Sequence, residues 1–132
     1  MPTLEQVKDF FTADRYATEV TGIEIETARA GYARCRLTIE PRHRNAVGNV
    51  MGGVLFTLAD FTFAVATNFE APSTVTTVGN ISFLSAAKGD TLFSESRLIK
   101  DGRSTCVYEI SVTDDTGELI AIVTMQGLHL KK

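Results

Sequence analysis

One long apolar segment constrains the fold of this chain more than any other feature. From Gly52 to Phe69 the sequence reads GGVLFTLADFTFAVATNF, and Asp60 is its only charged residue. The length approaches the roughly 20 apolar residues of a membrane-spanning helix. Asp60, however, would then lie near the middle of the bilayer, where a carboxylate costs about 3 kcal/mol on insertion scales. The segment is therefore predicted to be a helix of a globular protein, buried on nearly all sides, in which a carboxylate requires an explanation.

Length and charge limit the function classes. The 132 residues, 44% of them hydrophobic, suffice for one domain over residues 1–132 with a real core and are too few for two domains. Thirteen Lys and Arg residues against 16 Asp and Glu residues give a net charge of −3, with no basic cluster. Because phosphate binding needs concentrated positive charge, this composition argues against nucleic acid as a partner.

The cysteines and the N-terminus indicate an intracellular protein. Cys35 and Cys106 lie in alternating, strand-like segments and lack the spacing of metal ligands, so we predict two free buried thiols. The opening MPTLEQVKDFF has no basic start followed by an apolar block, as a signal peptide would. A cytoplasmic location and no membrane partner are the expectation.

Local patterns predict helices at two places. Thr3 with Gln6 three residues later resembles a capping box, and an apolar stripe follows, so a short helix is expected that ends before Tyr16. A polar loop, 41–50, precedes the central helix, and Pro72 is expected to mark the end of that helix.

The remaining segments alternate in hydrophobicity or are rich in Val, Ile, Thr and Phe. They predict strands around 23–25, 33–39, 74–84, 91–100, 103–113 and 119–130. The first two are joined near Ala30-Gly31, and the last three by Asp101-Gly102 and the turn closing at Gly117, both strong hairpin signals.

These elements predict an α+β fold in which about six antiparallel strands wrap around one long central helix, with an additional helix at the N-terminus. Such a sheet leaves open edges, and one helix cannot cover everything. A homodimer, or a homotetramer built as a dimer of dimers, is therefore expected.

An ordered set of short motifs resembles a known family. The first motif consists of Asn45, Gly48, Met51-Gly52-Gly53 and Leu58-Ala59-Asp60. The second is NISFLSAAKGD at 80–90, and the turns at 100–103 and 114–117 also fit. Together they resemble the hotdog acyl-CoA thioesterases of the phenylacetyl-CoA thioesterase (PaaI-like) family, from Gly22 to the C-terminus. The resemblance implies the hotdog fold and hydrolysis of an acyl-CoA thioester, with no cofactor because CoA is part of the substrate.

Thioester hydrolysis needs a donor for the carbonyl oxygen and a group that attacks the carbonyl or activates water. Gly52 opens the central helix, where backbone N–H groups are unpaired and the dipole is positive, so its N–H is the expected oxyanion donor. Asp60 can act as nucleophile or general base, a role that the resemblance assigns to it. Asn45 could orient water or the carbonyl, and Thr76 lies where the family often carries a hydroxyl.

Other residues are candidates for substrate binding. They are Met51, Gly53, Phe63, Ser85, Lys88, Lys100 and Arg103, the last three as partners for CoA phosphates.

Each candidate also has an ordinary structural interpretation. Asp60 could satisfy a loop, Asn45 could be a turn residue, the two glycines could permit close packing, and Thr76 could be a typical strand threonine. The basic residues could simply be solvated. Phe56, Phe63 and Thr67 share a helical face with Asp60, and we expect mainly core there, with Phe63 partly in a pocket. His43 and His129 are expected at the surface or at strand ends.

The spacing of the two central groups predicts a shared site. Asp60 follows Gly52 by eight residues, or about 12 Å along a straight helix at 1.5 Å per residue. One thioester carbonyl cannot reach both, so Gly52 of one chain is expected to work with Asp60 of its partner across a dimer interface. A carboxylate facing a partner and a solvent-accessible cleft would explain Asp60.

One departure from the family pattern leaves alternatives open. Met51 replaces the usual histidine before the two glycines and cannot donate a comparable hydrogen bond. The backbone donor at Gly52 survives this change. The rival hypotheses are a catalytically weak acyl-CoA-binding protein with the same groove, and a hotdog hydratase, whose Asp/His pair is not recognisable here.

Overall fold

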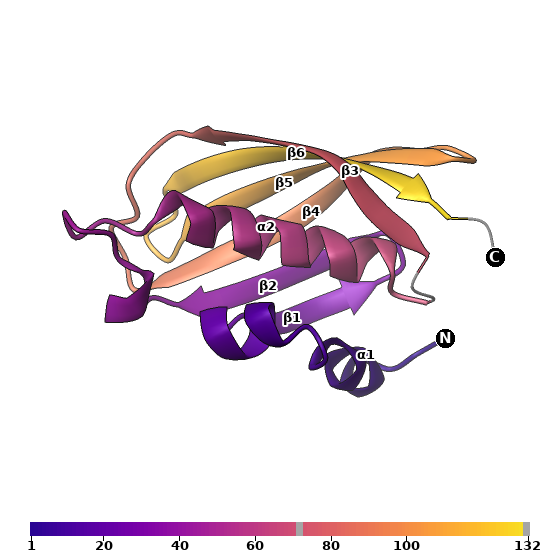
Figure 1. Ribbon diagram of the computed structural model, residues 1–132, viewed down its shortest axis with the longest axis horizontal. Coiled ribbons are helices and arrows are strands. Elements are labelled where there is room, and N and C mark those ends of the chain that lie inside the picture. Colours follow the sequence, from indigo (N-terminus) through magenta and orange to yellow (C-terminus); the bar gives the residue numbers. More distant parts are fainter. Residues whose placement is uncertain (71–72, 131–132) are drawn as a thin grey trace.

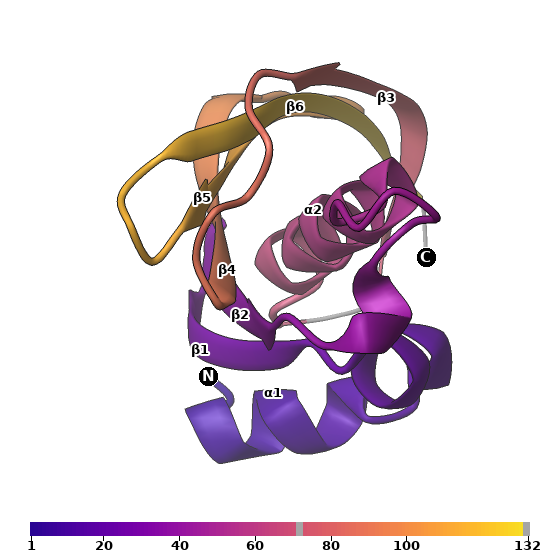
Figure 2. The same ribbon diagram turned by 90° about the vertical axis from the view of Figure 1, so that its left-hand side faces the viewer.

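The apolar segment forms one continuous helix, α2 (Gly52–Thr67), and an antiparallel sheet curves around it (Figures 1 and 2). The computed structural model describes residues 1–70 and 73–130. The strands are β1 (Glu24–Arg29), β2 (Tyr32–Thr38), β3 (Thr74–Phe83), β4 (Thr91–Asp101), β5 (Thr105–Asp114) and β6 (Leu119–His129). The remaining elements are the helices α1 (Leu4–Phe11), η1 (Tyr16–Thr21, a π-helix) and η2 (Pro41–His43, a 3-10 helix).

The six strands form one sheet in the order β1-β2-β4-β5-β6-β3, and every neighbouring pair is antiparallel. The predicted hairpins join β4 to β5 and β5 to β6, and Gly31, at φ +78°, lies in the turn between β1 and β2. The chain reaches α2 after β2 and returns as β3, which pairs with β6 at the far edge. The predicted α+β architecture of six strands around a central helix is confirmed, and it is the hotdog fold that the resemblance implied.

The core lies between α2 and the concave face of the sheet. Leu58, Ala59 and Val65 of α2 have no exposed surface. Cys35 and Cys106 are both buried and free, as predicted, and burial raises the pKa of the Cys35 thiol to about 12. That thiol therefore stays protonated and inert at neutral pH.

The N-terminal helix begins with the predicted capping box. The Gln6 N–H donates to Thr3 Oγ1 at 3.2 Å, and the Thr3 N–H donates to Gln6 Oε1 at 2.9 Å. Phe11 is buried and meets Phe61 of α2 edge-on at 5.8 Å between ring centroids. The helix ends at Phe11, before Tyr16 as predicted, and attaches the start of the chain to the central helix.

Two local details differ from the sequence prediction. No element was predicted for residues 16–21, which form η1. The helix α2 ends at Thr67, because Asn68 Oδ1 accepts the N–H groups of Ser73 and Thr74 at 2.8 Å each and so directs the chain into β3. Pro72, expected to mark the helix end, lies outside the described residues. Among the residues described, no helix has the length and apolar character to cross a membrane.

Candidate active site

One stripe of α2 is left open by the sheet. Gly53, Thr57, Asp60 and Ala64 recur every three or four residues and therefore share one side of the helix. Gly53 and Asp60 are exposed, and Thr57 and Ala64 are partly exposed. The prediction that α2 is buried on nearly all sides is wrong for this stripe, because no strand covers that side (Figure 2). η1 lies alongside α2 there instead.

Asp60 lies in a pocket of about 300 Å³ between α2 and the segment that leads into η1. Its residues are Asp14, Arg15, Tyr16, Ala17, Thr57, Asp60, Phe61 and Ala64. Partial enclosure by this pocket raises the pKa of the Asp60 carboxyl, a hydrogen bond from Thr76 opposes the rise, and the negative charge of Asp14 adds to it. A carboxylate with a raised pKa is a better proton acceptor than an ordinary aspartate.

Thr76 is the neighbour of Asp60 on the sheet. Its Oγ1 donates to Asp60 Oδ1 at 3.4 Å across the space between β3 and α2. The register of β3 against β6 shifts between Thr76 and Val78, a bulge of the kind that redirects side chains near functional sites. The structure thus brings together two predicted site residues that are 16 positions apart.

Gly52 lies at the start of α2, where it is the first helical residue. The first N–H groups of a helix have no partner within it, and those of Gly52 and Gly53 donate to no acceptor among the described residues. A Cβ on Gly52 would lie 3.0 Å from the Phe83 ring, so a side chain here would press on β3. Glycine therefore lets the helix start pack beside Phe83, and its N–H is left without a partner among the described residues.

The Gly52 side of the helix start faces an open groove of about 520 Å³. This groove is lined by Asn45, Asn49, Val50, Gly52, Leu55, Phe83, Leu84, Ser85 and Ala86. Asn45 Oδ1 accepts the N–H groups of Val47 and Asn49 at 3.1 Å each. Asn45 therefore does serve as a turn residue, and only its amide NH₂ remains available to a substrate. Ser85 Oγ donates to Glu118 Oε1 at 2.9 Å.

Met51 and Gly53 face a different pocket, of about 310 Å³, on the opposite side of the helix start. Met51 is 57% exposed and provides no side-chain cap for α2. The other residues of this pocket are Tyr16, Val20, Thr21, Arg42, His43, Val54 and Thr57. Gly52, the predicted oxyanion donor, and Gly53, a predicted substrate-binding residue, thus line separate depressions.

Phe63 and His43 require corrections. Phe63, expected partly in a pocket, is 1% exposed and packs edge-on against Tyr108 at 5.4 Å between ring centroids, so it belongs to the core. His43, expected at the surface, is 3% exposed. Its Nδ1 accepts the Glu40 N–H at 2.9 Å and its Nε2 lies 2.7 Å from the Thr21 carbonyl oxygen, which assigns the proton to Nε2.

His43 also fixes the approach to the helix. The Met51 N–H donates to the His43 carbonyl at 2.9 Å, which links the turn at 41–43 to the start of α2. His129, by contrast, lies at the end of β6 as expected and bonds to Thr74 and Asp101 at 2.8 Å each.

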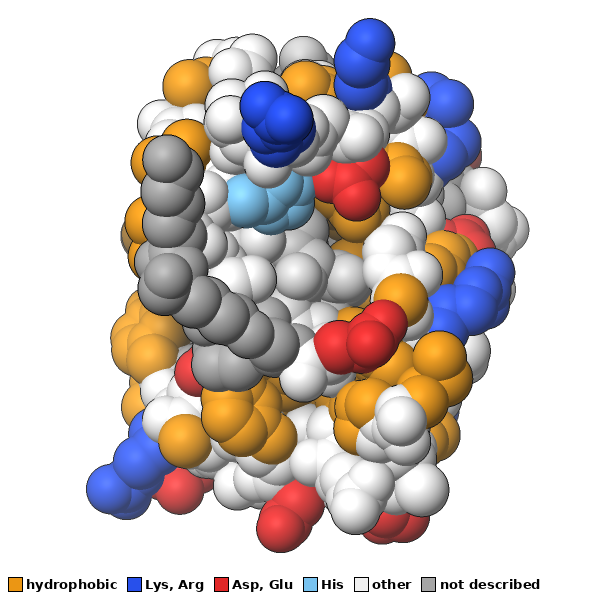
Figure 3. All heavy atoms as spheres, turned by 90° about the vertical axis from the view of Figure 1, so that its right-hand side faces the viewer, with side chains coloured by type: hydrophobic (Ala, Val, Ile, Leu, Met, Phe, Trp, Pro, Cys, Tyr) orange, Lys and Arg blue, Asp and Glu red, His pale blue; other side chains and the backbone are white. Residues whose placement is uncertain are grey.

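The three basic candidates do not form one group in a single chain. Lys88 precedes β4, whereas Lys100 and Arg103 lie at its other end. The length of β4 separates them by roughly 33 Å at 3.3 Å per residue. On the face of the molecule shown in Figure 3, side chains of both charges are scattered among hydrophobic ones. Within one chain these residues cannot hold the same phosphate groups.

Asp14 and Tyr16 are site residues that the sequence reasoning missed. Both line the Asp60 pocket, from a segment for which no element was predicted. The signal was weak: Tyr16 and Val20 are spaced four residues apart, as on one face of a helix.

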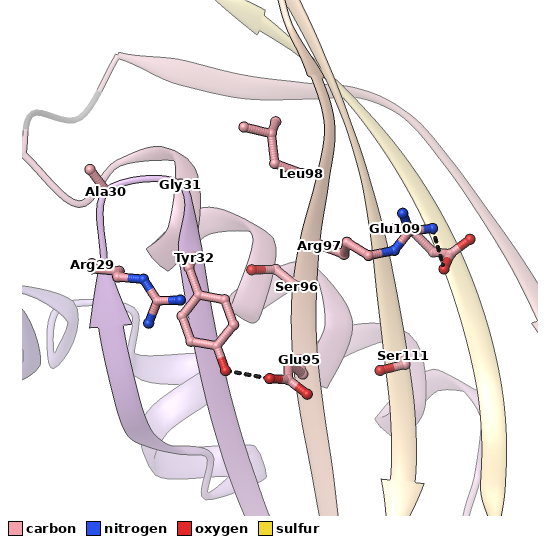
Figure 4. Close-up of a pocket in the computed structure, with 10 residues that line it drawn as sticks. All are labelled: Arg29, Ala30, Gly31, Tyr32, Glu95, Ser96, Arg97, Leu98, Glu109 and Ser111. Carbon is pink, nitrogen blue, oxygen red and sulfur yellow. Dashed lines mark hydrogen bonds and ion pairs between the residues drawn. The ribbon is translucent and has the colours of Figure 1, made fainter.

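A larger pocket, of about 540 Å³, lies away from these groups, between the turn that joins β1 to β2 and neighbouring residues of β2, β4 and β5 (Figure 4). Its charged groups already have partners. Tyr32 donates to Glu95, Arg29 stacks on the Tyr32 ring at 4.0 Å, and Arg97 pairs with Glu109 at 3.1 Å. We therefore place the candidate active site on α2. In the described part of the chain, no group of three or more His, Cys, Asp and Glu residues has the arrangement of a metal site.

Comparison with known sequences identifies relatives. The model of the thioesterase superfamily matches residues 47–121. Human acyl-coenzyme A thioesterase 13 is 31% identical over 134 residues, covering 98% of this chain and 93% of that protein. The Escherichia coli acyl-coenzyme A thioesterase PaaI is 31% identical over 102 residues, covering 76% and 73%.

Solved structures agree with this result. The E. coli PaaI protein of the phenylacetic acid degradation operon superposes with a TM-score of 0.84 at 25% identity, covering 98% of this chain and 97% of that one. A hypothetical thioesterase from Streptococcus pneumoniae, solved with coenzyme A, gives a TM-score of 0.80 at 25% identity, covering 92% and 98%.

Proposed function

The chain belongs to the thioesterase superfamily, which makes it a thioester hydrolase, and on that premise we propose that it hydrolyses an acyl-CoA to the free acid and CoA. The observation that carries the proposal is the Asp60–Thr76 pair on the open side of α2, together with the unpaired N–H at the start of the same helix. Relatives named acyl-coenzyme A thioesterase and a structural neighbour solved with coenzyme A support the choice of substrate.

The proposed chemistry uses a backbone donor and a carboxylate, with no cofactor. The Gly52 N–H binds the carbonyl oxygen and stabilises the negative charge that develops there. Asp60 either attacks the carbonyl carbon, forming an anhydride that water then hydrolyses, or takes a proton from the attacking water. In both cases Asp60 must be ionised, and the sulfur leaves as CoA thiol.

The site requires two chains. Because α2 is continuous from Gly52 to Thr67, the two groups are about 12 Å apart along its axis. That distance exceeds what one thioester carbonyl can span. We therefore assign each site to Gly52 of one protomer and Asp60 of its partner.

The two edges of the sheet support pairing through β3. The β1 edge is short and carries Glu24, Glu26 and Arg29, charges that discourage another strand. β3 has ten residues, none of them charged, and most of them are exposed. Val75 and Val78 are 44% and 40% exposed along it. A long, uncharged edge of this kind is the natural place for a second copy.

Pairing of two β3 edges would also assemble the proposed site. Gly52 adjoins Phe83 at one end of β3, and Asp60 bonds to Thr76 near the other end. An antiparallel pairing about a two-fold axis near Gly79 and Asn80 sets Phe83 of one protomer opposite Thr76 of its partner. The same symmetry brings Gly52 towards the partner's Asp60.

Mixed dimers test this shared site. Asp60→Asn should lower kcat by about 10²- to 10⁴-fold, since the amide can neither attack nor accept a proton usefully. Gly52→Pro removes the donor while keeping a residue that helix starts accept. Each variant alone should be inactive, and verified mixed dimers should recover part of the thiol release, because one of their two sites contains both intact groups.

Gly52→Ala is the matched control. It adds a Cβ against Phe83, as proline does, but it keeps the N–H. It should therefore retain more activity than Gly52→Pro. Verified mixed dimers without recovered activity would contradict the shared site.

A second candidate function is acyl-CoA binding with little turnover. It is favoured by Met51, which is exposed at the helix start and offers no hydrogen bond there, and by the Asn45 oxygen, which is occupied within its own turn. A thiol-release assay over acetyl-, medium-chain, long-chain and aryl-acyl-CoAs separates the two. Tight binding without release from any of them would establish the binding function instead.

A further inference from the structure

Two pockets adjoin on the open side of α2, and we treat them together as one groove. The pocket beside Asp60 and the pocket beside Met51 and Gly53 share two lining residues, Tyr16 and Thr57. Tyr16 comes from η1, which contacts α2, and Thr57 belongs to the open stripe of α2. The pair therefore forms a boundary between two compartments of about 300 and 310 Å³.

The groove suits an apolar chain. Beyond Asp60 its apolar lining is Ala17, Phe61 and Ala64 on one side of the boundary and Val20 and Val54 on the other. The charged lining residues are Asp14, Arg15 and Arg42. Burial of methylene groups against the apolar lining is favourable, at about 0.8 kcal/mol per group. The groove begins at the proposed attacking carboxylate. When the thioester carbonyl carbon lies beside Asp60, the groove is therefore positioned to hold one of the two substituents of that carbon.

The two substituents of the thioester carbonyl carbon are the acyl chain and the CoA arm. The groove beside Gly52 suits the CoA arm better than the groove along α2 does. The groove at Gly52 is more open to solvent, and the loop that carries Ser85 continues to Lys88. A polar pantetheine arm loses less hydration in an open groove than in the apolar one. The acyl chain is thus assigned to the groove along α2 beside Asp60, and the CoA arm to the open groove beside the partner's Gly52.

We propose that Tyr16 sets the length of the acyl chain that the enzyme accepts, by closing the groove against Thr57. The inference rests on the proposed function and adds its substrate class. Thr57 precedes Asp60 by three residues, so the boundary is about 4.5 Å from the carboxylate along the helix axis. Short acyl groups end before Tyr16. Medium-length chains have to displace its ring in order to reach Gly53, which lies about 10 Å from Asp60.

Tyr16 can be altered without disturbing the core. The residue is 67% exposed, and its hydroxyl makes no hydrogen bond to the described residues. Tyr16→Ala should join the two compartments, whereas Tyr16→Phe keeps the ring and should leave the boundary closed. Phe10→Ala is the matched control, because it removes a ring that is 53% exposed on α1 and lines neither compartment.

The test is kcat/KM for acetyl-, butyryl-, octanoyl- and dodecanoyl-CoA with the wild type and the three variants. We expect Tyr16→Ala to raise the octanoyl-to-butyryl ratio at least about tenfold, the size of discrimination that apolar pockets achieve. Tyr16→Phe and Phe10→Ala should keep the wild-type ratio. Binding affinities for the same four acyl-CoAs can be measured by calorimetry on the inactive Asp60→Asn variant. In an Asp60→Asn, Tyr16→Ala double variant, the octanoyl-to-butyryl ratio of affinities should rise as well.

The outcomes separate the two proposals. An active Tyr16→Ala protein with an unchanged chain-length profile would overturn the role of Tyr16 and leave the thioesterase proposal intact. Absence of thiol release from the wild type with every acyl-CoA would overturn the proposed activity. In that case, acyl-CoA affinities that Tyr16→Ala leaves unchanged would overturn the role of Tyr16 as well. A higher octanoyl-to-butyryl ratio of affinities would instead support Tyr16 as the residue that sets chain length in a binding protein.

Discussion

At the residue scale, the carboxylate in the apolar helix has a physical explanation. Asp60 lies on the open stripe of α2, where Thr76 donates to it and a pocket partly encloses it. Water and a hydroxyl partner make its charge tolerable there, and partial burial keeps its pKa raised. The hydrogen bond satisfies the carboxylate without burying it in the core.

Asp14 should tune this carboxyl group. The charged groups that line the Asp60 pocket are Asp14 and Arg15, and the Arg15 guanidinium is paired with Glu19 at 3.1 Å. Asp14→Asn removes a negative charge that disfavours ionised Asp60, so the pKa of Asp60 should fall. Since the proposed reaction needs ionised Asp60, the acidic limb of kcat/KM should move to lower pH.

A pH–rate profile checks this shift. Asp9→Asn is the control, because Asp9 is an exposed acid of α1 that does not line the pocket. It should leave the acidic limb in place. A limb that moves equally in both variants, or in neither, would contradict the role of Asp14.

At the scale of elements, one buried carboxylate ties two loops together. Asp114, at the end of β5, is 2% exposed. Its Oδ2 accepts the N–H groups of Lys88 and Gly89 at 2.8 and 3.0 Å, and its Oδ1 accepts the Thr116 hydroxyl. Burial opposes ionisation, but these hydrogen bonds outweigh it and hold the pKa of Asp114 well below its usual range. The loop that ends beside β4 is thereby attached to the β5–β6 turn.

Asp114→Asn should lower the free energy of unfolding by about 1–3 kcal/mol at neutral pH, because the amide cannot accept all these hydrogen bonds. The folded-state pKa lies below the unfolded one, so the contribution of the carboxylate is full above the unfolded pKa of about 3.8 and is lost as the pH falls towards the folded value. The difference between variant and wild type should therefore shrink in acid.

Urea unfolding at a series of pH values measures this difference. Asp115→Asn should cost less, because Asp115 accepts a single exposed hydrogen bond from the Asp90 N–H, which the amide oxygen can still accept. Two outcomes would argue against the role of Asp114 in joining the two loops. One is an equal loss of unfolding free energy in both variants, and the other is a loss for Asp114→Asn that does not change with pH.

At the scale of the whole molecule, the uncharged β3 edge is the proposed dimer interface. Val78 is exposed and close to the proposed two-fold axis. Val78→Lys places two like charges near each other across that axis and adds the charge with which sheet edges discourage pairing. The variant should be monomeric at micromolar concentration by light scattering, and it should lose thiol release because each site then lacks its partner.

The control for this variant is Thr27→Lys, which adds the same charge at the exposed β1 edge. It should remain dimeric and active. A wild type that is monomeric, or a Val78→Lys monomer with full activity, would refute the shared site.

The sequence by itself determined the features that depend on near neighbours. The capping box at Thr3, the turns at Gly31 and Gly117, and the alternation in the strands all act over a few residues, so they could be predicted correctly. The ordered motifs from Asn45 to Asp60 likewise identified the family. Such patterns fix which face of an element is apolar, and they leave open what covers that face.

Only the tertiary structure decided which distant residues meet. Thr76 reaches Asp60, and Asp14 and Tyr16 close its pocket, because β3 and η1 pack beside α2. The same packing buries His43, which was expected at the surface, and leaves one stripe of the apolar helix open. Hydrophobic burial is non-directional, so a residue's own segment does not reveal which neighbour will cover it. That choice depends on the combined packing of segments far apart in the chain.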